Sequence, residues 1–292
     1  MLSELPAVDI LFLPSSCYRT GADMRVVLLA GGKGTRLQEE TVARPKPMVE
    51  IGGKPILWHI MKHYAFYRHT EFYIALGYLG EHIKNYFVAQ HNLSGDLSID
   101  FAKGVVQSEK PRFENWTVHL VDTGSETLTG GRLGQLQSRV GDDSFLLTYG
   151  DGVSDINLEE LVTFHKKQGR VATVAAVRPP ARFGGLVIDD GLVKSFTEKP
   201  AAGEGWINGG FMVLEPDIFQ YIHGDQCSLE SDVLESVAAD GQLAAYRHYG
   251  FWQCMDTLRD KLYLEREWSK GVAMWDTWSL KERPAGQRPH AA

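Results

Sequence analysis

The sequence is poor in cysteine, and this scarcity excludes two common ways of stabilising a fold. Its 292 residues include only Cys17, Cys227 and Cys254, which are odd in number, far apart and outside any Cys-x-x-Cys pair. A disulfide framework usually needs an even set of cysteines, and a structural zinc site needs closely spaced ligands. We therefore expect neither, and the composition fits the reducing cytoplasm.

The chain also lacks a long apolar run and an excess of basic residues. No segment is apolar for long enough to suggest a membrane span. With 30 basic and 37 acidic residues the net charge is −7, which argues against a general nucleic-acid binder but allows a small polyanion held by a few cations. The first residues lack the basic start of a signal peptide. We expect a disordered leader over 1–23, one domain over 24–278 and a disordered tail over 279–292.

What the chain does have is an alternation of short apolar runs with apolar residues at helical spacing, which predicts an α/β fold. The strands are expected at residues 25–30, 72–76, 145–149, 171–177 and 210–214, near 97–101 and 117–122, and in a hairpin over 186–196 turning at 190–191. The helices are expected from residue 56, with Pro55 in the first turn, over 80–87, from 158 with Asn157 as cap, over 216–222, around 229–237, and from Thr257 with Asp260 in a capping box.

A glycine-rich loop follows the first expected strand. It reads Gly31-Gly32-Lys33-Gly34-Thr35-Arg36, and Lys46 follows between Pro45 and Pro47. Glycines allow close approach of a ligand and can aim backbone N–H groups at an anion. A dinucleotide fingerprint starting at Gly32 would need glycine where Leu37 stands, and no P-loop string occurs. The loop and its cations therefore indicate a triphosphate cradle.

Two aspartates are candidates for a metal site. Asp151 stands between Gly150 and Gly152 after an expected strand, where ligands of α/β sheets collect, and an unshielded carboxylate suits a hard cation such as Mg²⁺. Asp256 precedes the last helix and is either a second metal carboxylate or a capping residue. Asp151, likewise, can be explained as the cap of a turn.

Weaker signals surround these motifs. Thr127 and Arg132 lie in a small, polar, glycine-bearing segment typical of a nucleotide-base loop, and the run Glu198-Lys199, followed by Asn208-Gly209, fits either a sugar-phosphate site or a salt-bridged loop. The histidines are better explained as helix-face residues than as ligands, and the C-terminal aromatics as packing or interface residues than as residues that stack on a base. This group comprises His59, His63, His165, Phe251, Trp252, Trp268, Trp275 and Trp278.

In their order along the chain, these motifs resemble the sugar-1-phosphate nucleotidylyltransferases over almost all of 24–278. Within that family the resemblance is strongest to the glucose-1-phosphate cytidylyltransferase branch, because Glu39-Glu40-Thr41 follows GTRLQ where other branches usually carry proline at position 39. The strings that carry the resemblance are RPKPMVEIGGKPILWHIMK (44–62), VDTGSETLTGGRL (121–133), LLTYGDGVSD (146–155), RFGGLVI (182–188), INGGFMVL (207–214) and MDTLRDK (255–261).

The resemblance implies a Rossmann-like, mixed and mostly parallel sheet flanked by helices. It implies that Arg36, Lys46 and Asp151 are catalytic and that Asp151 and Asp256 hold Mg²⁺. The nucleotide site would comprise Leu29, Ala30, Gly31, Gly32, Lys33, Gly34, Thr35, Arg36, Lys46, Thr127, Arg132 and Gly150. The sugar-phosphate site would comprise Glu198, Lys199, Asn208 and Gly209.

The expected reaction is transfer of CMP from CTP to glucose 1-phosphate, in a cytoplasmic homo-oligomer that serves polysaccharide biosynthesis. Neither nucleic acid nor membrane is an expected partner. A uridylyl or guanylyl transferase acting on another sugar 1-phosphate is the main alternative, and a catalytically silent sugar-nucleotide sensor is the second. A nicotinamide oxidoreductase is disfavoured by Leu37.

Overall fold

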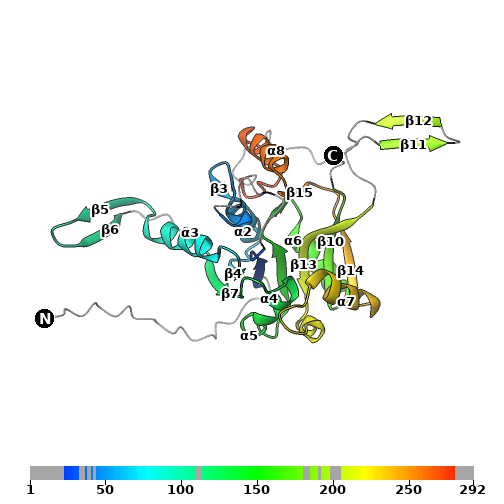
Figure 1. The fold of residues 1–292 in the computed structure, drawn as a ribbon, viewed down its shortest axis with the longest axis horizontal. Helices are drawn as coiled ribbons and strands as arrows, with labels where there is room; N and C mark the ends of the chain where they lie inside the picture. Colours follow the sequence, from blue (N-terminus) through cyan, green and yellow to red (C-terminus); the bar gives the residue numbers. More distant parts are fainter. Residues whose placement is uncertain are drawn as a thin grey trace.

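The fold is described from a computed structural model (Figure 1) that covers residues 23–32, 37, 41, 44–109, 114–179, 185–189, 192–197 and 205–279. Its centre is a seven-stranded sheet with the order β14-β10-β13-β8-β1-β4-β7. The strands are β1 (Val26–Leu29), β4 (Glu71–Leu76), β7 (Thr117–Asp122), β8 (Phe145–Tyr149), β10 (Ala172–Val177), β13 (Ile207–Leu214) and β14 (Leu243–Arg247). Only β13 runs against its neighbours, so the predicted mixed, mostly parallel sheet is confirmed.

Strand β1 shows why the sheet is covered on both faces. All four of its residues are buried, and successive side chains point to opposite faces. Val26 and Leu28 belong to one apolar core, whereas Val27 and Leu29 belong to the other. A continuous apolar run is typical of a strand with helices on both sides.

The first core is covered by α2 (Ile56–Phe66), α6 (Leu158–Gln168) and α8 (Leu258–Ser269), with α3 (Gly80–Asn92) at its edge. The second is covered by α4 (Thr129–Gln135), α5 (Gln137–Val140), the 3₁₀ helix η3 (Pro216–Tyr221), the π-helix η4 (Leu229–Leu234) and α7 (Glu235–Ala239). Asn157 caps α6, and Thr257 with Asp260 forms the capping box of α8, both as predicted.

Short elements complete the architecture. They are the 3₁₀ helix η2 (Lys46–Met48) and the antiparallel pairs β2 (Glu50–Ile51) with β3 (Lys54–Pro55), β5 (Asp96–Asp100) with β6 (Val105–Glu109), β9 (Gly152–Ser154) with β15 (Trp252–Cys254), and β11 (Gly185–Asp189) with β12 (Leu192–Thr197). The antiparallel pairing of β11 with β12 confirms the hairpin expected over 186–196, and its turn at 190–191 lies outside the described residues. The β5–β6 hairpin extends beyond α3, away from the central sheet (Figure 1).

Some expectations were wrong in detail. Helix α3 continues to Asn92 rather than ending near 87, and residues 216–221 form a 3₁₀ helix. Pro55 lies in β3 and caps α2 instead of entering its first turn. Within the described part of the chain, no helix is long and apolar enough to cross a membrane. Cys227 and Cys254 are free thiols.

Candidate active site

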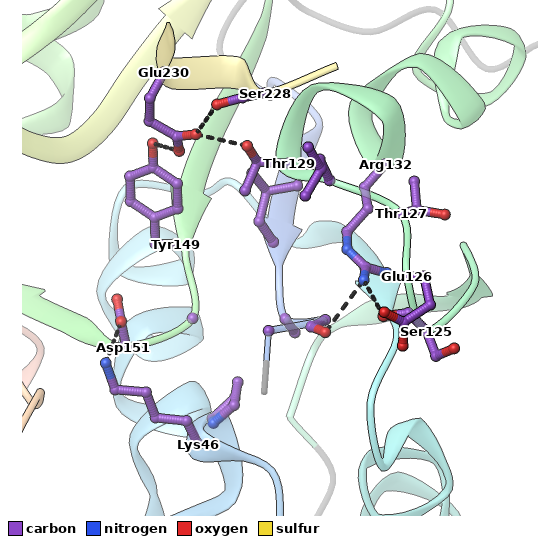
Figure 2. A pocket seen from close by; sticks show the side chains of 17 residues that line it. Lys46, Ser125, Glu126, Thr127, Thr129, Arg132, Tyr149, Asp151, Ser228 and Glu230 are labelled. Carbon is purple, nitrogen blue, oxygen red and sulfur yellow. Dashed lines mark hydrogen bonds and ion pairs between the residues drawn. The ribbon is translucent and has the colours of Figure 1, made fainter. Parts of the chain in front are cut away.

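A cavity of about 640 Å³ opens at the carboxyl ends of β1 and β8, the edge of the sheet where the sequence places the glycine loop and Asp151. Two parallel neighbours end here together, since Leu29 pairs with Tyr149. Figure 2 shows the side chains that converge on the cavity from five segments. They are Leu29, Ala30, Gly31, Gly32, Lys46, Pro47, Ser125, Glu126, Thr127, Leu128, Thr129, Arg132, Tyr149, Gly150, Asp151, Ser228 and Glu230.

The start of the glycine loop is shaped by Arg132. A Cβ on Gly31 would lie 2.3 Å from Cζ of Arg132, whereas a Cβ on Gly32 would meet no atom of the described residues within 4 Å. The first reason for glycine at position 31 is therefore the close approach of a protein side chain, that of Arg132. The rest of the predicted cradle, Lys33, Gly34, Thr35 and Arg36, lies outside the described residues.

Arg132 lines the cavity but directs its guanidinium at the protein. Nη1 donates to the carbonyl of Leu76 at 2.9 Å, to Thr123 Oγ1 at 2.7 Å and to the carbonyl of Gly124 at 2.7 Å. Nη2 donates to the carbonyl of Gly31 at 3.2 Å. The side chain is 4% exposed. Arg132 thus ties the glycine loop to the segment that carries Thr127.

Lys46 lies between the two predicted metal carboxylates. Its Nζ is 2.6 Å from Oδ2 of Asp151 and 2.5 Å from Oδ1 of Asp256, and the three side chains are 12%, 31% and 21% exposed. Burial lowers the pKa of Lys46, but the charges and hydrogen bonds of the two aspartates outweigh burial and leave that pKa raised. Pro45 and Pro47 flank Lys46, and the backbone N–H of Met48 donates to the carbonyl of Pro45, which fixes the direction of η2.

The structure distinguishes between the two explanations for Asp256, a metal carboxylate or a helix-capping residue. The N-cap of α8 is Thr257, whose hydroxyl accepts from the N–H of Asp260, so the carboxylate of Asp256 is not the cap. The backbone N–H of Asp256 donates to Oδ2 of Asp260 at 3.1 Å, and the N–H of Met255 donates to the carbonyl of Asp151 at 2.9 Å. The bond from Met255 to Asp151 holds Asp256 beside Asp151, although these two aspartates are 105 positions apart in the sequence.

The donor set at this point fits a divalent metal ion. Two carboxylates from separate segments direct oxygens at one position that carries a positive charge, and carboxylate oxygens are the donors that hard divalent cations prefer. Burial, with the nearby charges of Asp256 and Asp151, raises the pKa of the Cys254 thiol to about 12, so this sulfur stays protonated and is a poor ligand. The described residues contain no group of three or more His, Cys, Asp or Glu placed to hold a metal, so oxygen donors from water or substrate would complete the shell.

The cavity has a further cluster that sequence reasoning missed. The Glu230 carboxylate accepts hydrogen bonds from Tyr149 Oη at 2.6 Å, Thr129 Oγ1 at 2.6 Å and Ser228 Oγ at 3.0 Å (Figure 2). Burial, then the charge and hydrogen bond of Glu230, raises the pKa of Tyr149. The sequence signal that could have indicated this cluster is Tyr149 itself, a polar aromatic residue at the end of a buried strand next to Gly150.

On the predicted sugar side, Asn208 Oδ1 accepts from the N–H of Gly210 at 2.8 Å, and the carbonyl of Gly209 accepts from Trp252 Nε1 at 2.7 Å. Gly210 has φ +79°, and a Cβ there would lie 2.6 Å from Cδ2 of Tyr149. Tyr149 therefore lies between the cavity and the strand that carries Asn208 and Gly209. Glu198 and Lys199 lie outside the described residues.

The histidines and tryptophans set aside from the sequence are packing residues, as predicted. His59, His63 and His165 are buried and bond to Ile51, Thr277 and Thr173, respectively. Trp275, 1% exposed, stacks with Phe251 and Trp268.

Comparison with known proteins agrees with this geometry. The nucleotidyl transferase family model matches residues 25–260. The chain is 50% identical over 256 residues to the glucose-1-phosphate cytidylyltransferase of Salmonella typhi, a match that covers 87% of this chain and 100% of the relative. It is 45% identical over 257 residues to the probable glucose-1-phosphate cytidylyltransferase of Bacillus subtilis strain 168, with the same coverage.

Solved structures share the fold. HddC from Yersinia pseudotuberculosis superposes with a TM-score of 0.62 at 23% identity, covering 84% of this chain and 99% of the other. A UDP-glucose pyrophosphorylase complexed with UDP-glucose superposes with a TM-score of 0.59 at 17% identity, covering 85% and 99%. By the family model, which matches most of the chain, and by its identity to these relatives, this chain belongs to the nucleotidyl transferase family.

Proposed function

We propose that the chain transfers CMP from CTP to α-D-glucose 1-phosphate, giving CDP-glucose and pyrophosphate. The observation that carries this proposal is the 50% identity extending over the whole length of the Salmonella typhi glucose-1-phosphate cytidylyltransferase. The geometry supports it, since Lys46, Asp151 and the first two glycines of the loop line one cavity large enough for a nucleotide, and Asp256 pairs with the same Lys46.

The chemistry is an in-line displacement at phosphorus. A phosphate oxygen of glucose 1-phosphate forms a bond to the α-phosphorus of CTP, and the bond from that phosphorus to the bridging oxygen of pyrophosphate breaks. The nucleophile is already an anion, so no side chain has to remove a proton. What the protein must supply is the alignment of two polyanions and the compensation of their charge.

Each part of the cavity has a place in this scheme. Residues 29–36 would wrap the triphosphate, and Arg36 and Lys46 would stabilise the charge on the departing pyrophosphate. Thr127, Arg132 and Gly150 would line the nucleotide site, with Arg132 acting by holding Gly31 and the 123–125 segment in place. Glu198, Lys199, Asn208 and Gly209 would receive the sugar phosphate.

Asp151 and Asp256 would hold the divalent ion, for which we propose Mg²⁺. A bound divalent ion supplies charge neutralisation and orientation at the α-phosphate. A divalent ion held by Asp151 and Asp256 would carry the positive charge that Lys46 supplies to these carboxylates, and the Lys46 amino group at the edge of the cavity would then be available to the phosphates.

Labelled nucleotides test the proposed reaction. With glucose 1-phosphate present, the label of α-³²P-CTP should appear in a nucleotide sugar of the mass of CDP-glucose, and the label of γ-³²P-CTP should appear in pyrophosphate. Label from the γ position in a sugar product would contradict attack at the α-phosphorus. Binding of CDP-glucose without turnover of CTP would instead favour a silent sensor.

A uridylyl or guanylyl transfer remains the second candidate. It is favoured by a 30% identity over 255 residues to the probable mannose-1-phosphate guanylyltransferase 1 of Oryza sativa subsp. japonica, a match covering 83% of this chain and 65% of the relative. The higher identity and full coverage of the cytidylyltransferases favour CTP.

A further inference from the structure

The β5–β6 hairpin has an apolar face that the described part of the chain leaves exposed. Its strands pair antiparallel with Ile99 opposite Val106, and residues opposite each other in such a pair project to the same face. Because side chains alternate along a strand, Leu97 shares this face with them. The three side chains are 38%, 51% and 62% exposed in the order Leu97, Ile99 and Val106. We call these three residues the apolar face of the hairpin.

The opposite face of the hairpin is mainly polar. It contains Asp96, Ser98 and Asp100 of β5, with Gln107 opposite Ser98 and the apolar Val105 opposite Asp100. Alternation of apolar and polar side chains is typical of an antiparallel sheet that buries one face and leaves the other in water. The pattern therefore indicates that the apolar face is covered in the working protein.

This chain does not supply the cover from its own cores. Among the described residues, neither apolar core includes one between positions 88 and 115, and the hairpin extends away from the central sheet (Figure 1). Half of the large apolar side chains that are exposed on the described residues lie between 88 and 106, and Phe101, in the turn of the hairpin, is 90% exposed. An exposed apolar patch of this kind marks an interaction site, and a two-stranded hairpin is only marginally stable by itself in water.

The distribution of charge favours another copy of the chain as the partner. The chain has a net charge of −7, so copies repel one another unless the surfaces that meet are uncharged. The apolar face carries no charge, and Asp96 and Asp100 project from the other side of the hairpin. A rotation axis brings the same face of each copy together and leaves these aspartates on the outside. The same aspartates disfavour an anionic lipid surface, which attracts basic segments.

We propose that the apolar face of the β5–β6 hairpin is an interface between copies of this chain, and that it packs against the same face of another copy around a symmetry axis. Removal of Leu97, Ile99 and Val106 from water drives the contact. The partner's hairpin supplies the second layer that each hairpin lacks within its own chain. The interface does not depend on the reaction that the chain catalyses.

Analytical ultracentrifugation of the full chain over a range of concentrations tests this interface. The wild type should sediment as a multiple of the 32.6 kDa chain. Val106→Glu places a charge without a partner in the contact, so the dissociation constant of the assembly should rise at least about 100-fold. Gln107→Glu adds a negative charge at the next position, on the polar face, and should keep the mass and the dissociation constant of the wild type.

Three results would overturn the proposal. A wild type that stays monomeric at every concentration would show that something other than a second copy covers the face, such as a segment of the same chain. Unchanged assembly of Val106→Glu would place the interface on another surface. Equal loss of assembly in both variants would contradict the choice of face. If circular dichroism shows that Val106→Glu is unfolded, Val106→Thr keeps the β-branched shape and should raise the dissociation constant on the order of tenfold.

Discussion

The amino group of Lys46 lies 2.6 Å from Oδ2 of Asp151, so the cation expected to bind phosphate is held by the carboxylate expected to bind metal. Asp256 meets the same amino group at 2.5 Å. If Asp151 and Asp256 hold a divalent ion, as proposed, Lys46 and that ion would compete for these carboxylates. Entry of metal and release of Lys46 toward a triphosphate would then favour each other, a coupling that linkage makes reciprocal.

Replacing Lys46 tests this competition. In Lys46→Met the two carboxylates lose the protein's own cation, so Mn²⁺ affinity without nucleotide should rise by about tenfold, while CTP affinity should fall. Electron paramagnetic resonance of free Mn²⁺ gives the first quantity and calorimetry the second. Lys62→Met, which removes a lysine paired with Glu114 at the surface, should change neither. Unchanged or weaker Mn²⁺ binding in Lys46→Met would refute the competition.

Asp151→Asn tests the metal site itself. The amide cannot supply the anionic oxygen, so turnover should fall at least about 100-fold while the thermal unfolding midpoint stays close to wild type. Asp143→Asn makes the same chemical change at an exposed residue just before β8 and should keep full turnover. Near-normal turnover of Asp151→Asn would exclude Asp151 as a metal ligand of the reaction.

The two glycines at the start of the loop form a matched pair. Gly31→Ala places a methyl group 2.3 Å from Cζ of Arg132, so the guanidinium must move and give up bonds to buried carbonyls. Urea denaturation should show a loss of about 1–3 kcal/mol in the free energy of unfolding. In Gly32→Ala the new methyl group meets no atom of the structurally described residues within 4 Å, so stability should stay close to wild type. Equal effects of the two substitutions would contradict the role given to Gly31.

Buried histidines predict a pH dependence of stability. Burial is the main cause that lowers the pKa of His59 and of His63 to about 4, from an ordinary value of 6.5. Both are neutral in the folded protein, whereas the unfolded chain takes up protons below pH 6.5. The stabilisation is thus complete above pH 6.5 and is lost as pH falls toward 4, by on the order of a few kcal/mol per histidine.

Urea denaturation at pH 7, 6, 5 and 4.5 measures this slope. His63→Gln should flatten it, since one group that protonates on unfolding is gone, whereas His223→Gln, at an exposed position, should keep the wild-type slope. An unchanged slope in His63→Gln would contradict the assignment.

The sequence predicts elements best where local chemistry and burial agree. The run 145–149 is a strand with the predicted bounds, because it is apolar throughout and ends at glycine. The last turn of α3 was missed because most of its residues are exposed polar groups without apolar periodicity. Strand β6 was missed for a related reason: Val105 and Val106 are exposed in a hairpin that packs on no core.

The residue types of the candidate site can be predicted from the sequence, but the contacts between their side chains cannot. The resemblance predicts Asp151 and Asp256 as one metal site, but only tertiary packing places Lys46 between them, across 105 and 210 positions. Glu230 was not predicted, because its neighbours Leu229, Val233 and Leu234 have the spacing of an ordinary amphipathic helix, whereas the chain forms a π-helix at these residues.

Nucleotide preference, measured by pyrophosphate release, tests most directly whether this chain transfers CMP from CTP to glucose 1-phosphate. Values of kcat/KM are compared for CTP, UTP, GTP and dTTP with glucose 1-phosphate and Mg²⁺. CTP should exceed each of the others by at least about 100-fold. Equal or higher values with UTP or GTP, or no pyrophosphate with any nucleotide, would contradict the account.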